Sequence, residues 1–392
     1  MSDIKELDHQ YIANTYARFP VTIVSGKGSV AVDDKGKEYI DMGCGIGVTA
    51  FGYCDDEWIS AVTAQLGKVQ HTSNLYYTEP GALLAEMLCG KTGMKKVFYC
   101  NSGAEANECA IKAARKYAAD TKGPEYFNIV TIKNGFHGRT LTTLAATGQE
   151  HYHEMFQPLT PGFVYADAGD IHSVMKLCAE NKTAALMFEC IQGEGGVVPL
   201  DKDFVQDMAH FARDEGMTVI VDEVQTGNGR TGALYSYMNY DIRPDIVSTA
   251  KGIGGGLPLG VCMLGEKVQD VFAPGDNGST FGGNPACCAG ALSILSRLDD
   301  KLMAGIREKG EYVFSALSGA PGVKCVTGMG LMIGVEPKGQ SAGDVVKKCM
   351  DMGVLCLTAK EKVRLLPALN IPMDELKKAV DIIKEACAEG EA

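Results

Sequence analysis

The sequence predicts an α/β protein, with a mostly parallel sheet in a large domain and a smaller α+β domain beside it. Residues 97–265 alternate short apolar runs with amphipathic stretches, which is typical of strand–helix–strand units. The two ends of the chain lack this alternation. The length of 392 residues, 46% of them apolar, is enough to bury the core of a large domain and of a second one.

Six apolar runs are expected to be strands of the large domain. They are VFYC from residue 97, FNIVTI from 127, AALMF from 184, MTVIV from 217, DIVSTA from 245 and GVCML from 260. A helix is expected from Asp203 to Glu215, because its apolar residues share one face and Gly216 follows as a stop. Continuous apolar strands with helices between them indicate a parallel sheet covered on both faces.

The chain ends are expected to form the small domain. Residues 29–42 predict a hairpin that turns around Lys35 and Gly36. After residue 298 the pattern is mixed, with a strand in GLMIGVE from 330 and a final helix at Met373–Ala388. We therefore assign residues 51–297 to the large domain, and residues 1–50 together with 298–392 to the small one.

Composition and charge exclude several classes of protein. The formal net charge of −12, without clustered lysine and arginine, argues against a nucleic-acid partner. The first residues carry acidic groups and no apolar core of the kind that a secretory signal needs, and no apolar run approaches the roughly 20 residues that span a bilayer. The 14 cysteines are mostly scattered singly and are expected to be reduced and buried. These features predict a cytoplasmic protein.

One histidine pair has the spacing of metal ligands. His151 and His153 are two residues apart, but no cysteine or carboxylate cluster accompanies them at ligand spacing. A pair in a surface loop is the favoured interpretation, and we expect no metal.

Polar, glycine-rich clusters follow five of the predicted strands. They are NSGAEAN after VFYC, FHGRT after FNIVTI, QGEGG after AALMF, DEVQ after MTVIV, and Lys251 after DIVST. Open parallel sheets bind ligands at the carboxyl ends of their strands. The sequence therefore predicts that these clusters meet at one edge of the sheet.

The cluster after the first strand has two interpretations. Ser102 can cap a helix, with Glu105 completing a capping box. Equally, the backbone N–H groups of Gly103 and Ala104 can bind a phosphate at a helix N-terminus. These residues alone do not separate a structural cap from a phosphate site.

Asp222 and Lys251 are the candidate catalytic residues. Asp222 ends an apolar strand, where a carboxylate needs a cation as its partner. The cation could be a protonated pyridine nitrogen, or a basic side chain in a structural ion pair. A magnesium site of the nucleotide-binding type would need a phosphate loop that is absent. Lys251 also follows an apolar strand, where desolvation and a cationic ring would lower its pKa toward the range of a nucleophile. The glycines after it resemble a dinucleotide loop only weakly.

Seven motifs together resemble those of the class III aminotransferases. They are SGAEAN, FHGRT, QGEGG, DEVQTGNGRTG, AKGIGGG, STFGGNP and RLLPALN, and they occur in the family's order from Tyr16 to Leu369. The resemblance implies a type I fold of pyridoxal phosphate-dependent transferases, similar to aspartate aminotransferase. It also implies a homodimer with active sites at the subunit interface.

The resemblance assigns roles toward the cofactor, pyridoxal 5′-phosphate. Lys251 would hold it covalently, Asp222 would pair with its pyridine nitrogen and Gln225 with its ring oxygen. Phe136 would stack on the ring, and the phosphate would be bound by Ser102, Gly103, Ala104 and Thr280, the last from the neighbouring subunit.

The resemblance also implies the substrates. Substrate-binding residues would be Tyr16, Arg139, Glu194, Ser279 and Arg364. Arg139 would bind the α-carboxylate as a bidentate fork. Glu194 would neutralise Arg364 while the amino donor is bound and release it when 2-oxoglutarate arrives.

The motifs are most similar to those of family members that act on N-acetylornithine. They imply formation of N-acetylglutamate 5-semialdehyde and glutamate in arginine biosynthesis. Succinylornithine, ornithine or another ω-amino acid is an alternative donor. An aminomutase on the same fold would not need the two-substrate residues, and a regulatory protein that only binds the cofactor would be expected to lack Lys251.

Two segments depart from the family pattern. After AFGY the chain reads CDDEW where the family usually has a histidine and a proline, and Cys190 stands where a proline usually precedes IQGE. Neither segment contains a residue assigned to catalysis.

Overall fold

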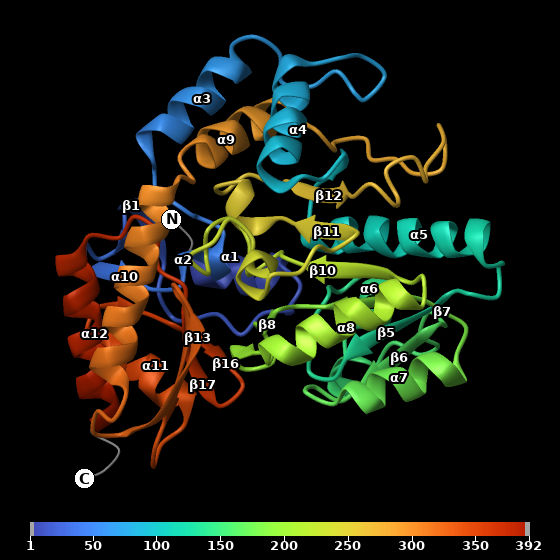
Figure 1. The fold of residues 1–392 in the computed structure, drawn as a ribbon. Helices are drawn as coiled ribbons and strands as arrows, with labels where there is room; N and C mark the ends of the chain where they lie inside the picture. The colour runs from blue at the N-terminus through green and yellow to red at the C-terminus, as the bar shows by residue number, and fades with distance from the viewer. Residues whose placement is uncertain (1–3, 389–392) are drawn as a thin grey trace.

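The computed structural model describes residues 4–388 and contains the α/β sheet that the sequence predicts (Figure 1). Seven strands form this sheet in the order β4-β12-β11-β10-β7-β5-β6. Their bounds are β4 Lys96–Cys100, β5 Asn128–Ile132, β6 Phe163–Ala166, β7 Thr183–Phe188, β10 Thr218–Asp222, β11 Ile246–Thr249 and β12 Gly260–Leu264. All six predicted strands are confirmed, with each end within one residue of its expected position. The edge strand β6 was not predicted, because its four residues are only partly buried apart from Ala166.

One strand of the sheet runs against the others. β12 is antiparallel to both β4 and β11, whereas the neighbours from β11 to β6 pair in parallel. The connection from β11 to β12 holds only a 3-10 turn at Lys251–Ile253, and a parallel return would need a crossover of a dozen or more residues. Strands β4, β5, β7, β10 and β11 therefore all point their carboxyl ends to the same edge.

Helices cover both faces of the sheet. α5 (Gly103–Thr121) packs through small residues such as Ala110 and Ala114 against Ile220 and its neighbours on one face. α4 (Glu79–Thr92), α7 (Ile171–Glu180) and α8 (Lys202–Asp214) belong to the core on the other face, where Val219 and Val221 point. The alternation of neighbouring strand residues between two cores confirms that the strands are buried on both sides.

The two chain ends meet in smaller sheets. β1 (Ile23–Lys27), β2 (Val30–Asp33) and β3 (Glu38–Asp41) form an antiparallel set that includes the predicted hairpin, and β15 (Val354–Leu355) adds to β3 in parallel. A second sheet has the order β13-β14-β17-β16, at Val323–Met329, Met332–Pro337, Lys362–Leu365 and Leu357–Ala359. The division at residues 50 and 297 stays a prediction, which the pairing of β3 with β15 supports.

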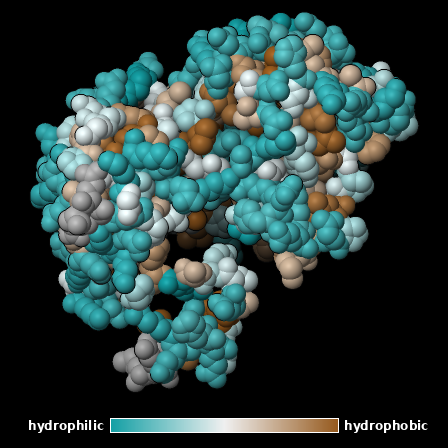
Figure 2. Space-filling view, turned by 90° about the horizontal axis from the view of Figure 1, so that it is seen from below, coloured by the Kyte–Doolittle hydropathy of each residue, from teal (hydrophilic) through white to brown (hydrophobic). Residues whose placement is uncertain are grey.

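The remaining elements connect these sheets. The helices are α1 Ile4–Tyr11, α2 Cys44–Gly47, α3 Asp56–Leu66, α6 Leu141–Ala146, α9 Pro285–Ser296, α10 Asp300–Leu317, α11 Ala342–Asp351 and α12 Met373–Ala388. A two-stranded ribbon is formed by β8 (Ile191–Gln192) and β9 (Val198–Pro199). The predicted helices at 203–215 and 373–388 correspond to α8 and α12. Within residues 4–388, no helix is both long and apolar enough to cross a membrane. Figure 2 shows one face of the molecule, which is largely hydrophilic with separate hydrophobic patches.

Candidate active site

A cavity of about 650 Å³ lies at the carboxyl ends of the parallel strands. It brings together residues that follow five different strands, as the sequence predicts. Its lining includes Tyr16, Asn101, Ser102, Gly103, Ala104, Asn107, Phe136, His137, Arg139, Glu189, Asp222, Gln225, Lys251 and Leu257.

Lys251 begins the 3-10 turn that follows β11 after Ala250, and it lines this cavity. Its φ of +47° is in the left-handed region, which a non-glycine residue seldom adopts. Burial lowers the pKa of its amine; Glu194 opposes this effect and Arg364 adds to it. A lower pKa makes the neutral amine more available, as a nucleophile or proton carrier requires.

Asp222 is the last residue of β10 and is almost fully buried. Its Oδ2 accepts hydrogen bonds from Asn107 Nδ2 at 2.7 Å and from His137 Nδ1 at 2.8 Å. Its Oδ1 accepts one from the Val224 N–H at 3.0 Å. The carboxylate is thus held from three sides while it faces the cavity.

The N-terminus of α5 forms one wall of the cavity. Ser102 caps the helix, because its Oγ accepts a hydrogen bond from the Glu105 N–H at 3.2 Å. The predicted capping box is wrong in one respect: the Glu105 carboxylate accepts from the N–H of Asn101, one residue earlier than the cap. Gly103 and Ala104 follow at the first turn, where N–H groups have no acceptor within the helix.

Phe136 and Arg139 line the cavity from the loop after β5. The Arg139 guanidinium lies 5.7 Å from the Phe136 ring centre and 4.5 Å from that of Tyr152. Gly138, with φ +135°, lets this loop approach α5, since a Cβ there would lie 2.9 Å from the Cβ of Ala104. Tyr16 reaches the cavity from the N-terminal segment and is mostly exposed.

Glu194 and Arg364 form an ion pair beside the cavity and are joined to it through Gln225; Arg364 is buried and Glu194 is partly exposed. Arg364 Nη1 donates to Glu194 Oε1 and to Gln225 Oε1, and Gln225 Nε2 donates to Glu194 at 3.2 Å. Burial alone would raise the pKa of Glu194, but the Arg364 guanidinium holds it below its usual value. The pair spans 170 residues of sequence, and its charges compensate each other at pH 7.

Ser279 and Thr280 lie in the loop before α9. Ser279 Oγ accepts from Asn101 Nδ2 at 3.1 Å, which places it next to the start of α5 in its own subunit. Thr280 is exposed and is absent from the described lining of the cavity. Its predicted role toward a neighbouring subunit stays a prediction.

Three residues of this site were missed by sequence reasoning. Glu189 lines the cavity and accepts hydrogen bonds from the Phe136 and Gly193 N–H groups at 2.8 and 3.1 Å. Burial raises its pKa to about 7, and the nearby His137 opposes that effect. Glu189 directly follows β7, and this position after an apolar strand is the signal that could have identified it. His137 and Asn107 were quoted within motifs but given no role.

The histidine pair at 151 and 153 is not a surface pair. His153 is buried, and its Nε2 lies 2.7 Å from the Thr147 carbonyl oxygen, so only His151 is exposed. The interpretation as two surface residues is therefore wrong for His153, because the imidazole closes the turn after α6. No group of three candidate metal ligands occurs among residues 4–388.

Comparison with known families identifies the family to which the chain belongs. Residues 11–387 match the family model described as aminotransferase class-III. The chain belongs to the class III aminotransferases. The predicted resemblance and fold are thereby confirmed, and the cavity described above is the candidate active site of a class III aminotransferase.

Relatives of this class III aminotransferase include proteins named as acetylornithine or ornithine aminotransferases. It is 46% identical over 387 residues to the acetylornithine aminotransferase of Haemophilus ducreyi, covering 98% of each chain. An ornithine aminotransferase structure from Toxoplasma gondii, described with partial occupancy of PLP at its active site, superposes with a TM-score of 0.94 at 32% identity, covering 99% of this chain and 94% of that one. The N-acetylornithine aminotransferase of Stenotrophomonas maltophilia gives a TM-score of 0.85 at 31% identity, with 98% of both chains covered.

Proposed function

We propose that this class III aminotransferase uses pyridoxal 5′-phosphate to transfer the side-chain amino group of N-acetylornithine to 2-oxoglutarate. The products are N-acetylglutamate 5-semialdehyde and glutamate, a step of arginine biosynthesis. The observation that carries the proposal is that Lys251 and Asp222 face one cavity, with the Glu194–Arg364 pair beside it. Relatives named for acetylornithine, at up to 46% identity across the chain, support the choice of donor.

The residues around the cavity fit this cofactor. A buried amine is available at Lys251, a carboxylate for the pyridine nitrogen at Asp222, and an aromatic ring at Phe136. The first N–H groups of α5, at Gly103 and Ala104 behind the Ser102 cap, suit a phosphate. The cofactor supplies an electron-withdrawing ring and a carbon that carries the amino group between donor and acceptor.

Lys251 is the residue that moves the proton. Burial lowers the pKa of its amine, so with the cofactor bound the amine would take up a proton from the reacting carbon of the substrate and hold it for return. The Asp222 carboxyl group would face the pyridine nitrogen of the cofactor, and His137 and Asn107 hold it in orientation. Arg139 is placed to bind a carboxylate of the substrate, backed by Phe136 and Tyr152.

Glu194 and Arg364 adapt the same site to two substrates. In the described structure they are paired. This state suits an amino donor that has only one carboxylate, because such a donor has no second carboxylate to bind Arg364. 2-Oxoglutarate has a second carboxylate that can replace Glu194 on the guanidinium, and the Gln225 contacts keep both side chains near the cavity. An aminomutase would need no such exchange.

We also propose that the enzyme works as a homodimer in which Thr280 contributes to the neighbouring site. Leu75 and Tyr77 are fully or nearly fully exposed, at 87% and 107%, and Phe281 is exposed in the loop that carries Thr280. Asn74 Nδ2 donates to the carbonyl oxygens of Ser279 and Gly282, both at 2.9 Å, so the two loops form one surface. Exposed apolar side chains gathered in this way are typical of a subunit interface.

Steady-state kinetics with purified enzyme test the reaction and the donor. We expect turnover of N-acetylornithine only when 2-oxoglutarate is added, and a higher kcat/KM for N-acetylornithine than for ornithine or succinylornithine. Turnover without a keto acid would support an aminomutase instead. A higher kcat/KM for ornithine would retain the aminotransferase and reject the donor.

A further inference from the structure

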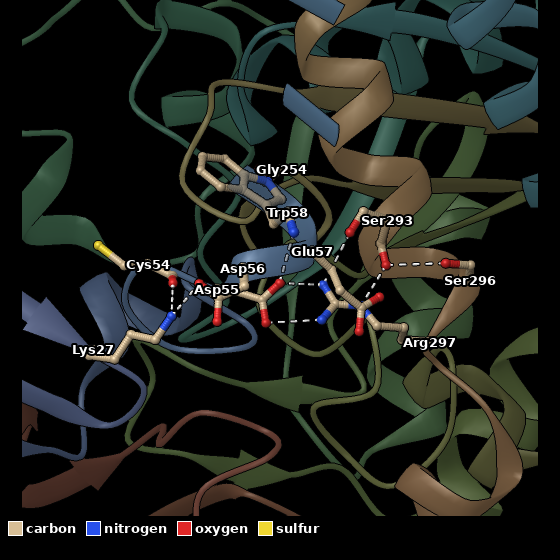
Figure 3. A network of polar contacts seen from close by, with 10 residues as sticks. All are labelled: Lys27, Cys54, Asp55, Asp56, Glu57, Trp58, Gly254, Ser293, Ser296 and Arg297. Atoms are coloured by element: carbon tan, nitrogen blue, oxygen red, sulfur yellow. Dashed lines mark hydrogen bonds and ion pairs between the residues drawn. The ribbon is translucent and has the colours of Figure 1, made fainter. Parts of the chain in front are cut away.

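The segment that departs from the family pattern, Cys54–Trp58, contacts the loop that follows Lys251 (Figure 3). Trp58 is the single tryptophan of the chain and lies in the first turn of α3. It is absent from the described lining of the cavity, so it reaches the site only through that loop. The function proposed above gives this contact no role.

The indole of Trp58 binds the loop at one carbonyl. Its Nε1 donates a hydrogen bond to the Gly254 oxygen at 3.1 Å, and the same oxygen accepts from the Leu257 N–H at 3.2 Å. The Gly254 N–H in turn donates to the Lys251 oxygen at 3.0 Å. Gly254 therefore links Lys251, whose φ is +47°, to Leu257 in the cavity wall, and the indole fixes this link from outside.

Glycines make room for the indole on two sides. A Cβ at Gly255 or at Gly290 would lie 2.7 Å from Trp58 Nε1, closer than side chains approach one another. Gly255 belongs to the loop and Gly290 to α9, so the ring is enclosed between the catalytic loop and a helix. Close packing of this kind restricts the loop to one arrangement.

A second set of contacts holds Trp58 in place. The Asp55 carboxylate caps α3 by accepting from the Trp58 N–H at 2.9 Å, and it receives a two-bonded fork from Arg297 at 2.7 and 3.0 Å. Arg297 Nε donates to the Ser293 oxygen in α9 at 2.8 Å, and the guanidinium lies over the Phe51 ring. Both side chains of the fork are mostly buried.

We propose that Trp58 is a positioning residue that holds Lys251 in its left-handed conformation through the hydrogen bond to Gly254. The proposal rests on the proposed role of Lys251. Because a left-handed lysine is held only by its surroundings, loosening the Gly254 carbonyl lets the amine move and admits water around it.

Trp58→Phe in the cofactor-loaded enzyme tests the proposal, because it keeps an aromatic ring and removes the donor. We expect kcat to fall about 5–10-fold while KM for both substrates stays within about twofold, since misplacement of a reacting group lowers the rate of the chemical step. The pH midpoint of the visible cofactor band, which reports protonation of the nitrogen that joins Lys251 to the cofactor, should rise by about half a unit, because water that enters around this nitrogen stabilises its charged form.

Val62→Ala is the matched control. Val62 is buried in α3 and also packs on Gly290, but it makes no contact with the loop hydrogen bond. It should lower Tm and leave kcat and the pH midpoint unchanged. Wild-type kcat and midpoint in Trp58→Phe, or the same changes in Val62→Ala, would overturn the positioning role.

A measurement without substitution covers the case in which Trp58→Phe does not fold. With one tryptophan, uniformly ¹⁵N-labelled protein gives one indole N–H signal, and a bond to Gly254 predicts slow exchange with deuterium. Exchange complete within the dead time would overturn the proposal. A wild-type enzyme that binds no cofactor would instead refute the proposed function, and the exchange experiment still reports on the contact.

Discussion

At the residue scale, the site depends on charges that are buried together. Lys251, Asp222, Glu194 and Arg364 lie close enough for the three others to influence the pKa of the lysine. Asp222 and the Glu194–Arg364 pair are held by hydrogen bonds, and Glu194 lies near enough to Lys251 to offset part of the effect of burial on its pKa. Because buried charges are costly without partners, changing one of them alters the state of the others.

Glu194→Gln should affect the two half-reactions unequally. The amide keeps the shape of the side chain but leaves the buried Arg364 without a counter-charge. The positive charge of Arg364 then repels the positively charged amine of the donor. We expect kcat/KM for N-acetylornithine to fall about tenfold or more and that for 2-oxoglutarate to change less than about threefold. Half-reaction rates from stopped-flow absorbance measure both. Glu180→Gln on the exposed face of α7 is the control, and equal losses for both substrates would contradict the two-substrate role.

Glu189 should make stability depend on pH. Its pKa is raised to about 7 in the folded protein, so its contribution to stability is present below the unfolded pKa of about 4.3 and is lost as pH rises through about 7. The wild type should therefore lose stability relative to Glu189→Gln between about pH 5 and pH 8, so the Tm of the variant minus that of the wild type should increase. Thermal unfolding of cofactor-free protein measures it. A difference that is constant over this range would contradict the raised pKa.

At the element scale, strand ends decide which residues form the site. The sequence predicts Asp222 and Lys251 because each lies at the end of an apolar strand and carries a charged group that needs a partner when buried. Glu189 has the same position after β7 but belongs to no single motif with an obvious task. The antiparallel direction of β12 could not be read from GVCML, because an apolar run has the same pattern in either direction and only the short connection fixes it.

The start of α3 gives a prediction at this scale. Asp55 caps the helix and binds Arg297; burial would raise its pKa, but the guanidinium and the Trp58 N–H lower it. Asp55→Ala should cost about 1–3 kcal/mol of unfolding free energy at pH 7. Because the folded pKa is lowered, this contribution is present above about pH 4 and lost as pH falls further, so the deficit should shrink in acid. Denaturant titrations at pH 7 and in acid measure it, and a pH-independent deficit would contradict the ionic role.

At the scale of the whole molecule, contacts between residues far apart in the sequence determine the parts of the site that local sequence patterns do not predict. The sequence predicts the central sheet, the hairpin and the last helix, because each has its own periodicity. It could not place His137 on Asp222, 85 residues away, since that contact arises only when β5 and β10 are aligned through β7. The Glu194–Arg364 pair came from resemblance alone, and the structure brings the two side chains together.

The exposed loop surface predicts the oligomeric state. Tyr77→Asp places a charge among exposed apolar side chains and should convert a dimer into a monomer with a large loss of activity. Sedimentation velocity measures the state, and Met175→Asp on α7 is the control at another exposed apolar position. A wild-type monomer with full activity, or a dimer in Tyr77→Asp, would contradict the proposed interface.

The most direct test of the account is the visible absorption spectrum of the cofactor-loaded enzyme, titrated first with N-acetylornithine and then with 2-oxoglutarate, beside Lys251→Ala. The account predicts that the band of the lysine-bound cofactor disappears with the donor and returns with the keto acid in the wild type only. A band that ignores N-acetylornithine would contradict the choice of donor. The absence of any such band in the wild type would contradict the role of Lys251 and with it the proposed function.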